Sequence, residues 1–234
     1  MDNQLDYFLV VLIGVAFITF VTFIISPGKK KPLTKKQLDE IEKKQKEWAE
    51  NRRIELENDK ERVTESEIRK LILDLKLPAV VLDFFNETYN DEAMEYELHE
   101  DYAIPYAILE LTKKQQDEYL IDRYKPILAY LHSTVFAYDS KLKGFIVYDI
   151  EDKIIEKEEC LTWDGIFVNE VLRWWENDIS DEDILHIGNL FGLKHTKEIL
   201  DSIYSTTEGK GFPTFEDTYK WEEAMIDQLN ARIK

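Results

Sequence analysis

The middle of the sequence, residues 127–150, reads ILAYLHSTVFAYDSKLKGFIVYDI. β-Branched and aromatic residues are frequent in Ile127–Tyr138 and Phe145–Ile150, and such residues favour strands. Asp139–Gly144, between these two stretches, carries the polar residues and the glycine of a turn. The segment therefore predicts an antiparallel β-hairpin, and Lys153–Glu158 is a candidate third strand.

Helical patterns flank this hairpin on both sides. Thr64 and Glu67 have capping-box spacing, and apolar residues follow them at helical intervals. A second helix is expected in LPAVVLDFFNETYN, residues 77–90. Later helices are expected at 162–177, 180–191, 196–204 and 214–233. The inward face of the last helix is predicted to carry Phe215, Tyr219, Ile226, Leu229 and Ile233. The sequence thus predicts an α+β domain at residues 64–234, with a central, mainly antiparallel sheet flanked by helices.

Upstream of this domain lies a long uncharged segment. Residues 7–26 read YFLVVLIGVAFITFVTFIIS, and twenty helical residues span about 30 Å, the thickness of the hydrocarbon core of a bilayer. A cleaved signal peptide would have a basic start and a shorter apolar stretch, whereas here Asp2 and Asp6 precede the segment. We therefore expect a retained transmembrane helix that binds the lipid bilayer, rather than a signal peptide or a buried core helix.

The charges around this segment predict its orientation. No Lys or Arg precedes it, whereas five membrane-flanking lysines follow it: Lys29, Lys30, Lys31, Lys35 and Lys36. Because positively charged flanks stay on the cytoplasmic side, residues 1–6 are expected outside and the C-terminal domain in the cytoplasm. A single cysteine, Cys160, excludes an intramolecular disulfide and fits a reducing compartment.

Charge also separates the segment after the anchor from the domain. Residues 1–63 hold 12 basic and 11 acidic residues, a net charge of +1, whereas residues 64–234 hold 18 and 37, a net charge of −19. Residues 27–63 are predicted to be a basic flank and a charged spacer helix, with Thr34 and Gln37 in capping-box spacing. Leu38, Ile41 and Trp48 share one seam, but Arg52 follows on it, so no lasting coiled coil is predicted.

The sequence contains no motif that predicts a catalytic site, a cofactor-binding site or a metal site. Gly209-Lys210-Gly211 lacks the preceding glycine and the hydroxyl of a phosphate-binding loop. Gly188 and Gly192 are expected to mark close packing or a helix end. The four histidines, His99, His132, His186 and His195, do not have metal-ligand spacing, and His132-Ser133 has no acid placed to orient the imidazole. A net charge of −18 argues against nucleic acid as a partner, and no small-molecule substrate is expected.

An acidic, aromatic segment is the candidate binding site. The stretch from Asp83 to Asp101 interleaves carboxylates with aromatic residues, either as a solvated face or as a surface for a basic protein partner. Trp174 and Trp175 are adjacent on a helix, so at least one should be partly exposed. The candidate partner-binding residues are Asp91, Glu92, Glu95, Tyr96, Glu97, Glu100, Asp101, Tyr102, Trp174 and Trp175.

The order of these elements resembles the SMI1/KNR4 (SUKH) superfamily over residues 64–205. That family has a Leu-Pro at a helix start, a Phe a few residues later, an Asn near the helix end, a central antiparallel sheet, and a late helix with an aromatic residue near its beginning. Leu77-Pro78, Phe84 or Phe85, Asn90 and Phe167 occupy these places, although Asp91 follows Asn90 where the family usually has glycine. The resemblance implies a binding protein without catalysis, and many members are bacterial immunity proteins that neutralise toxins.

These observations predict a membrane-anchored, non-enzymatic protein-binding domain, with a bacterial immunity protein as one form of it. A membrane-tethered structural or assembly scaffold is the alternative. An enzyme that uses some of the many carboxylates is a third hypothesis, for which the sequence offers no convergent groups.

Overall fold

The structure is a computed structural model that describes residues 34–88, 91–93, 97–98, 101–152 and 154–233. The chain divides into two compact units, Met1–Arg52 and Arg53–Lys234. Helix α2 (Lys35–Asn58) crosses the boundary between them, and every later element belongs to the second unit.

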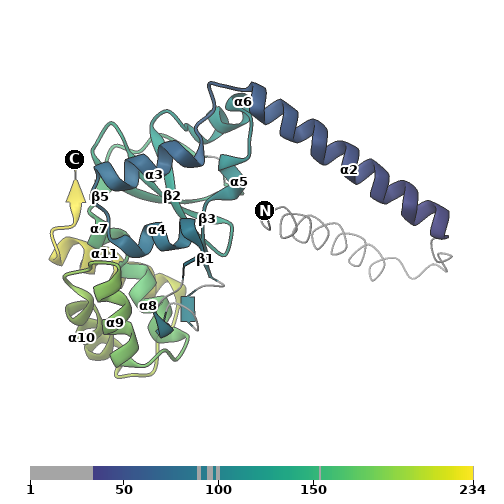
Figure 1. Ribbon diagram of the computed structural model, residues 1–234. Coiled ribbons are helices and arrows are strands. Elements are labelled where there is room, and N and C mark those ends of the chain that lie inside the picture. Colours follow the sequence, from purple (N-terminus) through teal and green to yellow (C-terminus); the bar gives the residue numbers. More distant parts are fainter. Residues whose placement is uncertain (1–33, 89–90, 94–96, 99–100, 153, 234) are drawn as a thin grey trace. The chain divides into compact units, whose positions relative to one another are not determined.

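The described part of the second unit is an α+β domain built on a six-stranded antiparallel sheet, which confirms the predicted fold class (Figure 1). The strands follow one another in the sheet in the order of the sequence. They are β1 (Tyr102–Ala103), β2 (Tyr124–Tyr130), β3 (Thr134–Asp139), β4 (Gly144–Asp149), β5 (Cys160–Leu161) and β6 (Arg232–Ile233). The helices of this unit are α3 (Glu65–Asp74), α4 (Ala79–Asn86), α5 (Tyr106–Leu109), α6 (Lys113–Gln116), the 3₁₀ turn η2 (Asp117–Tyr119), α7 (Trp163–Ile166), α8 (Val168–Glu176), α9 (Asp181–Leu190), α10 (Thr196–Thr207) and α11 (Phe215–Gln228).

The predicted hairpin exists between β3 and β4, where Phe136 lies opposite Val147. The prediction of one long strand over Ile127–Tyr138 was wrong, because β2 ends at Tyr130 and β3 begins at Thr134. Leu131 and His132 have positive φ angles of 45° and 64° and turn the chain between these strands. His132-Ser133 therefore lies in a turn and not in a strand.

The candidate third strand at Lys153–Glu158 was also wrong for its described residues, 154–158, which form no strand. Arg123 holds this segment by donating to a Glu156 carboxylate oxygen (2.7 Å) and to the Lys157 carbonyl (2.5 Å). The next strand, β5, begins only at Cys160 and pairs with β6.

The predicted capping box of Thr64 and Glu67 is present and begins α3. Ser180 and Thr214 cap α9 and α11 through their side chains. The predicted inward face of the last helix was wrong at its start, because Phe215 is 87% exposed and Tyr219 is 55% exposed. Ile226 is buried as predicted, and Trp221 and Met225 fill the rest of the buried face.

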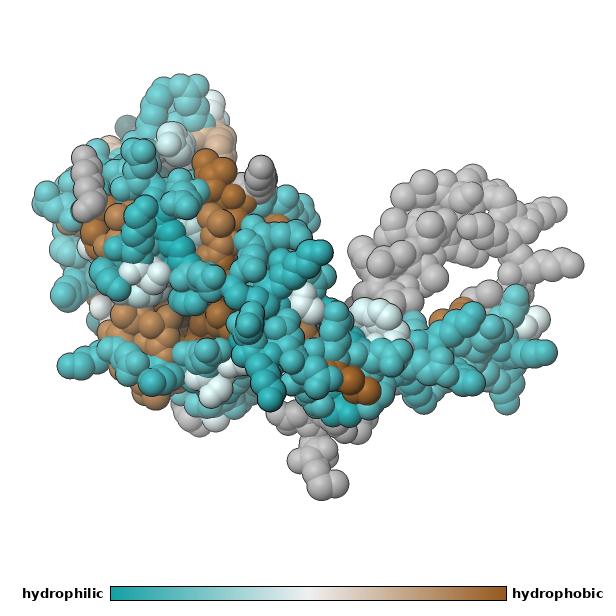
Figure 2. All heavy atoms as spheres, turned by 90° about the horizontal axis from the view of Figure 1, so that it is seen from above, coloured by the Kyte–Doolittle hydropathy of each residue, from teal (hydrophilic) through white to brown (hydrophobic). Residues whose placement is uncertain are grey.

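Aromatic side chains connect the sheet to helices that lie before and after it in the sequence. Phe167, between α7 and α8, stacks on Phe136 of β3 with ring centroids 5.5 Å apart. Phe191, at the end of α9, contacts Phe167 at 4.9 Å and Phe84 of α4 at 6.2 Å. These aromatic contacts fix α4, α8 and α9 against one another. Viewed from above, most of the surface is hydrophilic and the apolar side chains form separate patches (Figure 2).

Helix α2 spans 24 residues, about 36 Å at the rise of an α-helix, and buries none of them. The predicted cap is present, since the Thr34 backbone N–H donates to Gln37 Oε1 at 2.9 Å. Ion pairs one helical turn apart stabilise the helix: Lys44–Glu40, Lys46–Glu42, Lys43–Glu47 and Arg53–Glu57. After α2, Val63 is buried and bonds Gln116, so the residues just before Thr64 belong to the domain.

No helix among residues 34–233, where the structure describes them, is both long and apolar enough to cross a bilayer. The predicted transmembrane helix at residues 7–26 lies outside the described residues, and so do Lys29, Lys30 and Lys31. Lys35 and Lys36 are exposed in the first turn of α2.

The two glycines of IGNLFGL have the structural roles that the sequence predicted. A Cβ on Gly188 would lie 2.2 Å from Thr196 Oγ1 of α10, and Gly192 has a φ of +64° just after α9. We expect Gly188→Ala to lower the free energy of unfolding by about 1–3 kcal/mol, because Thr196 is buried and cannot move away. Chemical unfolding measures this loss.

The neighbouring exposed residue gives the control, since Asn189→Ala should change stability little. Thr196→Ala removes two of the three close atoms and should recover part of the loss in the double variant. A Gly188→Ala variant as stable as the parent would contradict this packing.

Candidate functional site

The predicted partner-binding residues do not all lie on the surface. Glu95, Tyr96 and Glu100 lie outside the residues that the structure describes. Tyr102 is fully buried and Trp174 is only 2% exposed, which corrects the expectation that these two side chains contact a partner. The cause is tertiary: β1 pairs with β2 and α8 packs on the core, and together they turn both rings inward.

Tyr102 and Trp174 belong to a buried polar cluster. The Tyr102 hydroxyl donates to Glu170 and accepts a hydrogen bond from Trp174 Nε1 at 3.2 Å. Arg173 donates to both Glu170 carboxylate oxygens, at 2.8 and 3.1 Å, and lies 4.1 Å from the centre of the Tyr130 ring. Burial raises the pKa of Glu170, while Arg173 and the Tyr102 hydroxyl act in the opposite direction. Glu170, Tyr102 and Trp174 are buried and Arg173 is partly exposed, and their bonds stabilise the junction of β1, β2 and α8.

The other described acidic candidates are at least partly exposed, and one of them, Asp91, contacts α9. Glu92 and Glu97 are exposed, and Asp91 and Asp101 are partly exposed. Asp91 Oδ2 lies 2.8 Å from His186 Nε2 on α9. This contact joins the acidic segment to a helix far along the sequence.

Trp175 is partly exposed, as expected for one of two adjacent tryptophans. Its ring meets Tyr204 of α10 edge-on, with centroids 5.8 Å apart and planes at 86°. Tyr204 is 41% exposed, and its hydroxyl donates to Asp181 Oδ1 of α9 at 2.8 Å. The Asp181 carboxylate raises the pKa of the Tyr204 hydroxyl. Trp175 thus has an aromatic neighbour whose orientation is fixed by an acid.

We group the residues of these two sets of contacts with Glu182, an exposed acid of α9, and call them the α9 surface: Asp91, Trp175, Asp181, Glu182, His186 and Tyr204. The sequence around it is strongly acidic, because no Lys or Arg occurs between Arg173 and Lys194, a stretch that holds five carboxylates. Sequence reasoning identified Asp91 and Trp175 but missed the other four residues. The acidic stretch between Arg173 and Lys194 was the available signal.

A hollow lies between α4 and α9 beside this surface, with a volume of about 320 Å³. Its lining combines apolar side chains with two carboxylates. The residues are Ala79, Val80, Asp83, Thr88, Asp91, Asn189 and Leu190.

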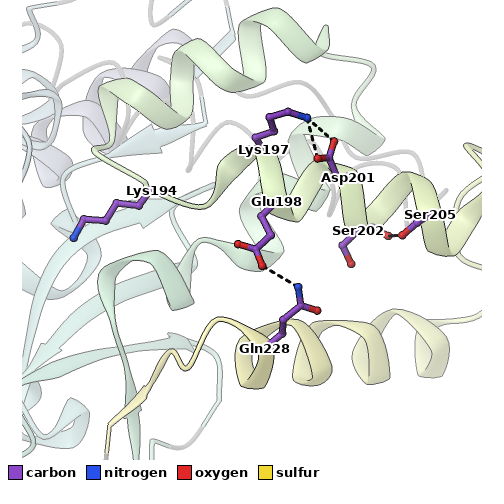
Figure 3. A pocket seen from close by; sticks show the side chains of 7 residues that line it. All are labelled: Lys194, Lys197, Glu198, Asp201, Ser202, Ser205 and Gln228. Carbon is purple, nitrogen blue, oxygen red and sulfur yellow. Dashed lines mark hydrogen bonds and ion pairs between the residues drawn. The ribbon is translucent and has the colours of Figure 1, made fainter.

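A larger, open groove of about 660 Å³ lies between α10 and α11 (Figure 3). Glu198 Oε1 accepts a hydrogen bond from Gln228 Nε2 across it at 2.9 Å, and Lys197 turns to Asp201 on its own helix. Ser202 accepts from Trp221 Nε1 at 3.0 Å. These polar groups bond to one another and do not converge on a common point in the groove.

The described residues bring together no group of three or more His, Cys, Asp or Glu side chains that could hold a metal ion. His195 Nδ1 lies 3.1 Å from Glu198 Oε2, and His186 pairs with Asp91, but no serine or cysteine is bonded to either ring among these residues. Cys160 is buried beneath Gly144 of β4.

Comparison with protein-family models, with curated proteins and with solved structures gave no match. The resemblance to the SUKH superfamily remains a prediction from the sequence pattern.

Proposed function

We propose that this protein is a membrane-anchored, non-enzymatic binding protein whose α9 surface binds a basic protein partner. The observation that carries the proposal is the Trp175–Tyr204 pair, which is partly exposed within a stretch of carboxylates. Tryptophan and tyrosine provide large contact areas at low entropic cost and are frequent among the residues that dominate binding energy. The surrounding acids would speed association with a positively charged surface.

The anchor is proposed from residues 7–26, which carry no charge over a length that spans a bilayer. The lysines that follow place the binding domain in the cytoplasm by the positive-inside rule. Helix α2 would then act as a spacer, because its intrahelical ion pairs stabilise it without burial of any of its residues.

The resemblance to SUKH proteins supports a toxin as the basic partner, and we propose an immunity protein as one form of this function. A positively charged nuclease would complement the net charge of −19 of residues 64–234. The binding chemistry does not depend on this choice, since any basic protein with a complementary surface would meet the same side chains.

Affinity capture tests the proposal. The full chain, immobilised in detergent, is exposed to proteins of its own cell and of its gene neighbourhood at low and high salt. A basic protein retained at low salt and released at high salt is expected, because salt screens attraction between exposed charges. We expect Trp175→Ala to weaken binding of the purified partner by about 2 kcal/mol, about 30-fold.

Tyr219→Ala is the matched control, because Tyr219 is an exposed tyrosine of α11 outside the α9 surface. Circular dichroism of both variants shows whether the domain stays folded. Equal binding by Trp175→Ala and the parent would remove the α9 surface from the proposal, and an empty column at low salt would remove the partner.

A membrane-tethered scaffold is the second candidate function, and the exposed seam of α2 favours it. Leu38, Ile41 and Trp48 are 52%, 40% and 60% exposed on that helix. In this alternative the anchor and spacer set the position of the domain, and the phenotype depends on them rather than on the α9 surface.

A further inference from the structure

We infer that the hollow between α4 and α9 holds the cationic side chain of an arginine or lysine from the partner. The inference rests on the proposed function and adds to it the part of the partner that is recognised. A volume of about 320 Å³ is at the small end of the range of about 300–1,000 Å³ for ligand pockets, and suits one side chain rather than a large ligand.

The hollow is apolar toward one end. Ala79 and Val80 begin α4, and Leu190 ends α9. Gly192, just after α9, lies so close to Pro78 that an added Cβ would meet Pro78 Cγ at 2.9 Å. The end of α9 therefore packs against the start of α4 and closes this end of the hollow.

The other end is acidic. Asp83 lies one turn after Ala79 on α4. Asp91 Oδ2 lies 2.8 Å from His186 Nε2 of α9. Local bonds hold both carboxylates in place: Asp83 Oδ1 accepts from Thr88 Oγ1 at 3.3 Å, and Asp91 Oδ1 accepts from the Ala93 N–H at 3.0 Å. The carboxylates are fixed before a ligand arrives, which lowers the entropic cost of binding.

An arginine or lysine side chain has the same two parts, since an aliphatic stem of three or four carbons carries a charged end. The stem would lie on Ala79, Val80 and Leu190, and the charged end would reach Asp83 and Asp91. None of the described residues that line the hollow is a Lys or Arg. An anionic side chain would meet two carboxylates there, and a neutral apolar one would make no charge-assisted bond with Asp83.

Nuclear magnetic resonance of the full chain, labelled with ²H and ¹⁵N in detergent micelles, tests this with n-butylguanidinium and n-butylammonium chlorides as probes. We expect saturable shifts in the amides of Asp83, Thr88, Asn189 and Leu190. n-Butanol lacks the charge and methylguanidinium lacks the stem, so both should bind at least about fivefold more weakly. Sodium chloride at equal concentration corrects for ionic strength.

Asp83→Asn should weaken binding of n-butylguanidinium about tenfold, the loss of one charge-assisted contact. Glu216→Gln is the matched control, because Glu216 is an exposed acid of α11 that neither lines the hollow nor belongs to the α9 surface. Asp91→Asn is a second variant, and the spectrum of each protein reports its fold. Shifts spread evenly over residues 176–183, or equal binding by Asp83→Asn and Glu216→Gln, would overturn the inference.

The outcome is separable from that of the proposed function. If a basic partner binds and Asp83→Asn leaves its affinity unchanged, the hollow does not bind the partner's cationic side chain, and the proposed binding function stands. If the probes bind in the hollow but no basic protein is captured, the hollow is a cation site and the proposed function fails.

Discussion

Replacing Glu170 with alanine is expected to lower the free energy of unfolding by about 3 kcal/mol. The variant leaves the Tyr102 hydroxyl and the Arg173 guanidinium without the carboxylate that accepts from both. Removing one partner of a buried ion pair costs about 3–5 kcal/mol, and the partial exposure of Arg173 puts this case at the lower end. Denaturant unfolding followed by circular dichroism measures the loss.

Glu176→Ala is the matched control, because Glu176 is exposed on the same helix and should change stability by less than about 0.5 kcal/mol. Glu170→Gln keeps an acceptor for Tyr102 and should lose less than Glu170→Ala. Equal stability of Glu170→Ala and Glu176→Ala would show that the buried cluster contributes nothing.

The pH dependence of the same site has a defined sign. Burial raises the pKa of Glu170 above its ordinary value of 4.5, so the folded state keeps a proton that the unfolded state releases. The contribution of Glu170 to the free energy of unfolding is therefore complete below about pH 4.5, and it falls as the pH rises toward the pKa of Glu170 in the folded state. Glu170→Gln should remove this decrease, and a slope that is unchanged in the variant would contradict the assignment.

Deleting residues 7–26 is expected to move nearly all of the protein from the membrane to the soluble fraction. The segment supplies twenty uncharged residues, whereas α2 carries charges along its whole length. Alkaline washing of membranes, followed by detection of the protein in pellet and supernatant, measures the change. Val11→Lys with Ile18→Lys tests the same point at full length, because each lysine costs about 2.5–3.5 kcal/mol near the centre of a transmembrane helix.

The orientation of the protein in the membrane can be measured with introduced cysteines, because the only native cysteine, Cys160, is buried. Asn3→Cys should react with an impermeant reagent in intact cells, and Lys210→Cys only after the cells are opened. The reverse pattern would place the domain outside. A mature protein that begins after residue 26 would identify the segment as a cleaved signal peptide.

The same deletion separates the two candidate functions. A binding protein should keep its affinity for the partner without residues 7–26, because the α9 surface lies in the domain. A scaffold should keep its partners in solution and lose its cellular phenotype, because its position is lost.

Local signals predicted the elements of the fold better than their ends. Thr34 and Thr64 marked two helix starts, because a capping side chain acts within a few residues of itself. The turn at Leu131–His132 was missed, because Leu131 is not typical of a positive φ and the segment lacks the glycine, asparagine or aspartate that usually marks a tight turn.

The end of α11 shows the same limit. Phe215 and Tyr219 have the right spacing for a buried face, but both are exposed, and Trp221 and Met225 are buried instead. The buried face depends on the elements that α11 packs against, such as α8, and helical periodicity does not contain that. The helix also ends at Gln228, because Arg232 and Ile233 pair with β5 as β6.

The candidate site divides in a similar way. Composition identified Asp91 and Trp175, because acids and aromatic residues are dense around them in the sequence. The same density wrongly included Tyr102, whose direction depends on the pairing of β1 with β2. Tyr204 and His186 were identified only from the structure, because Tyr204 contacts Trp175 of α8 and His186 contacts Asp91 of the acidic segment.

The two outermost strands of the described sheet, β1 and β6, are only two residues long. Strands this short cover little of the longer strands inside them. Among the described residues, β1 pairs with β2 at Ala129 and Tyr130, and β5 pairs with β4 at Phe145, so most of β2 and β4 has no strand partner on its outer side. A strand from another molecule would therefore meet the uncovered lengths of β2 and β4 rather than β1 and β6 themselves.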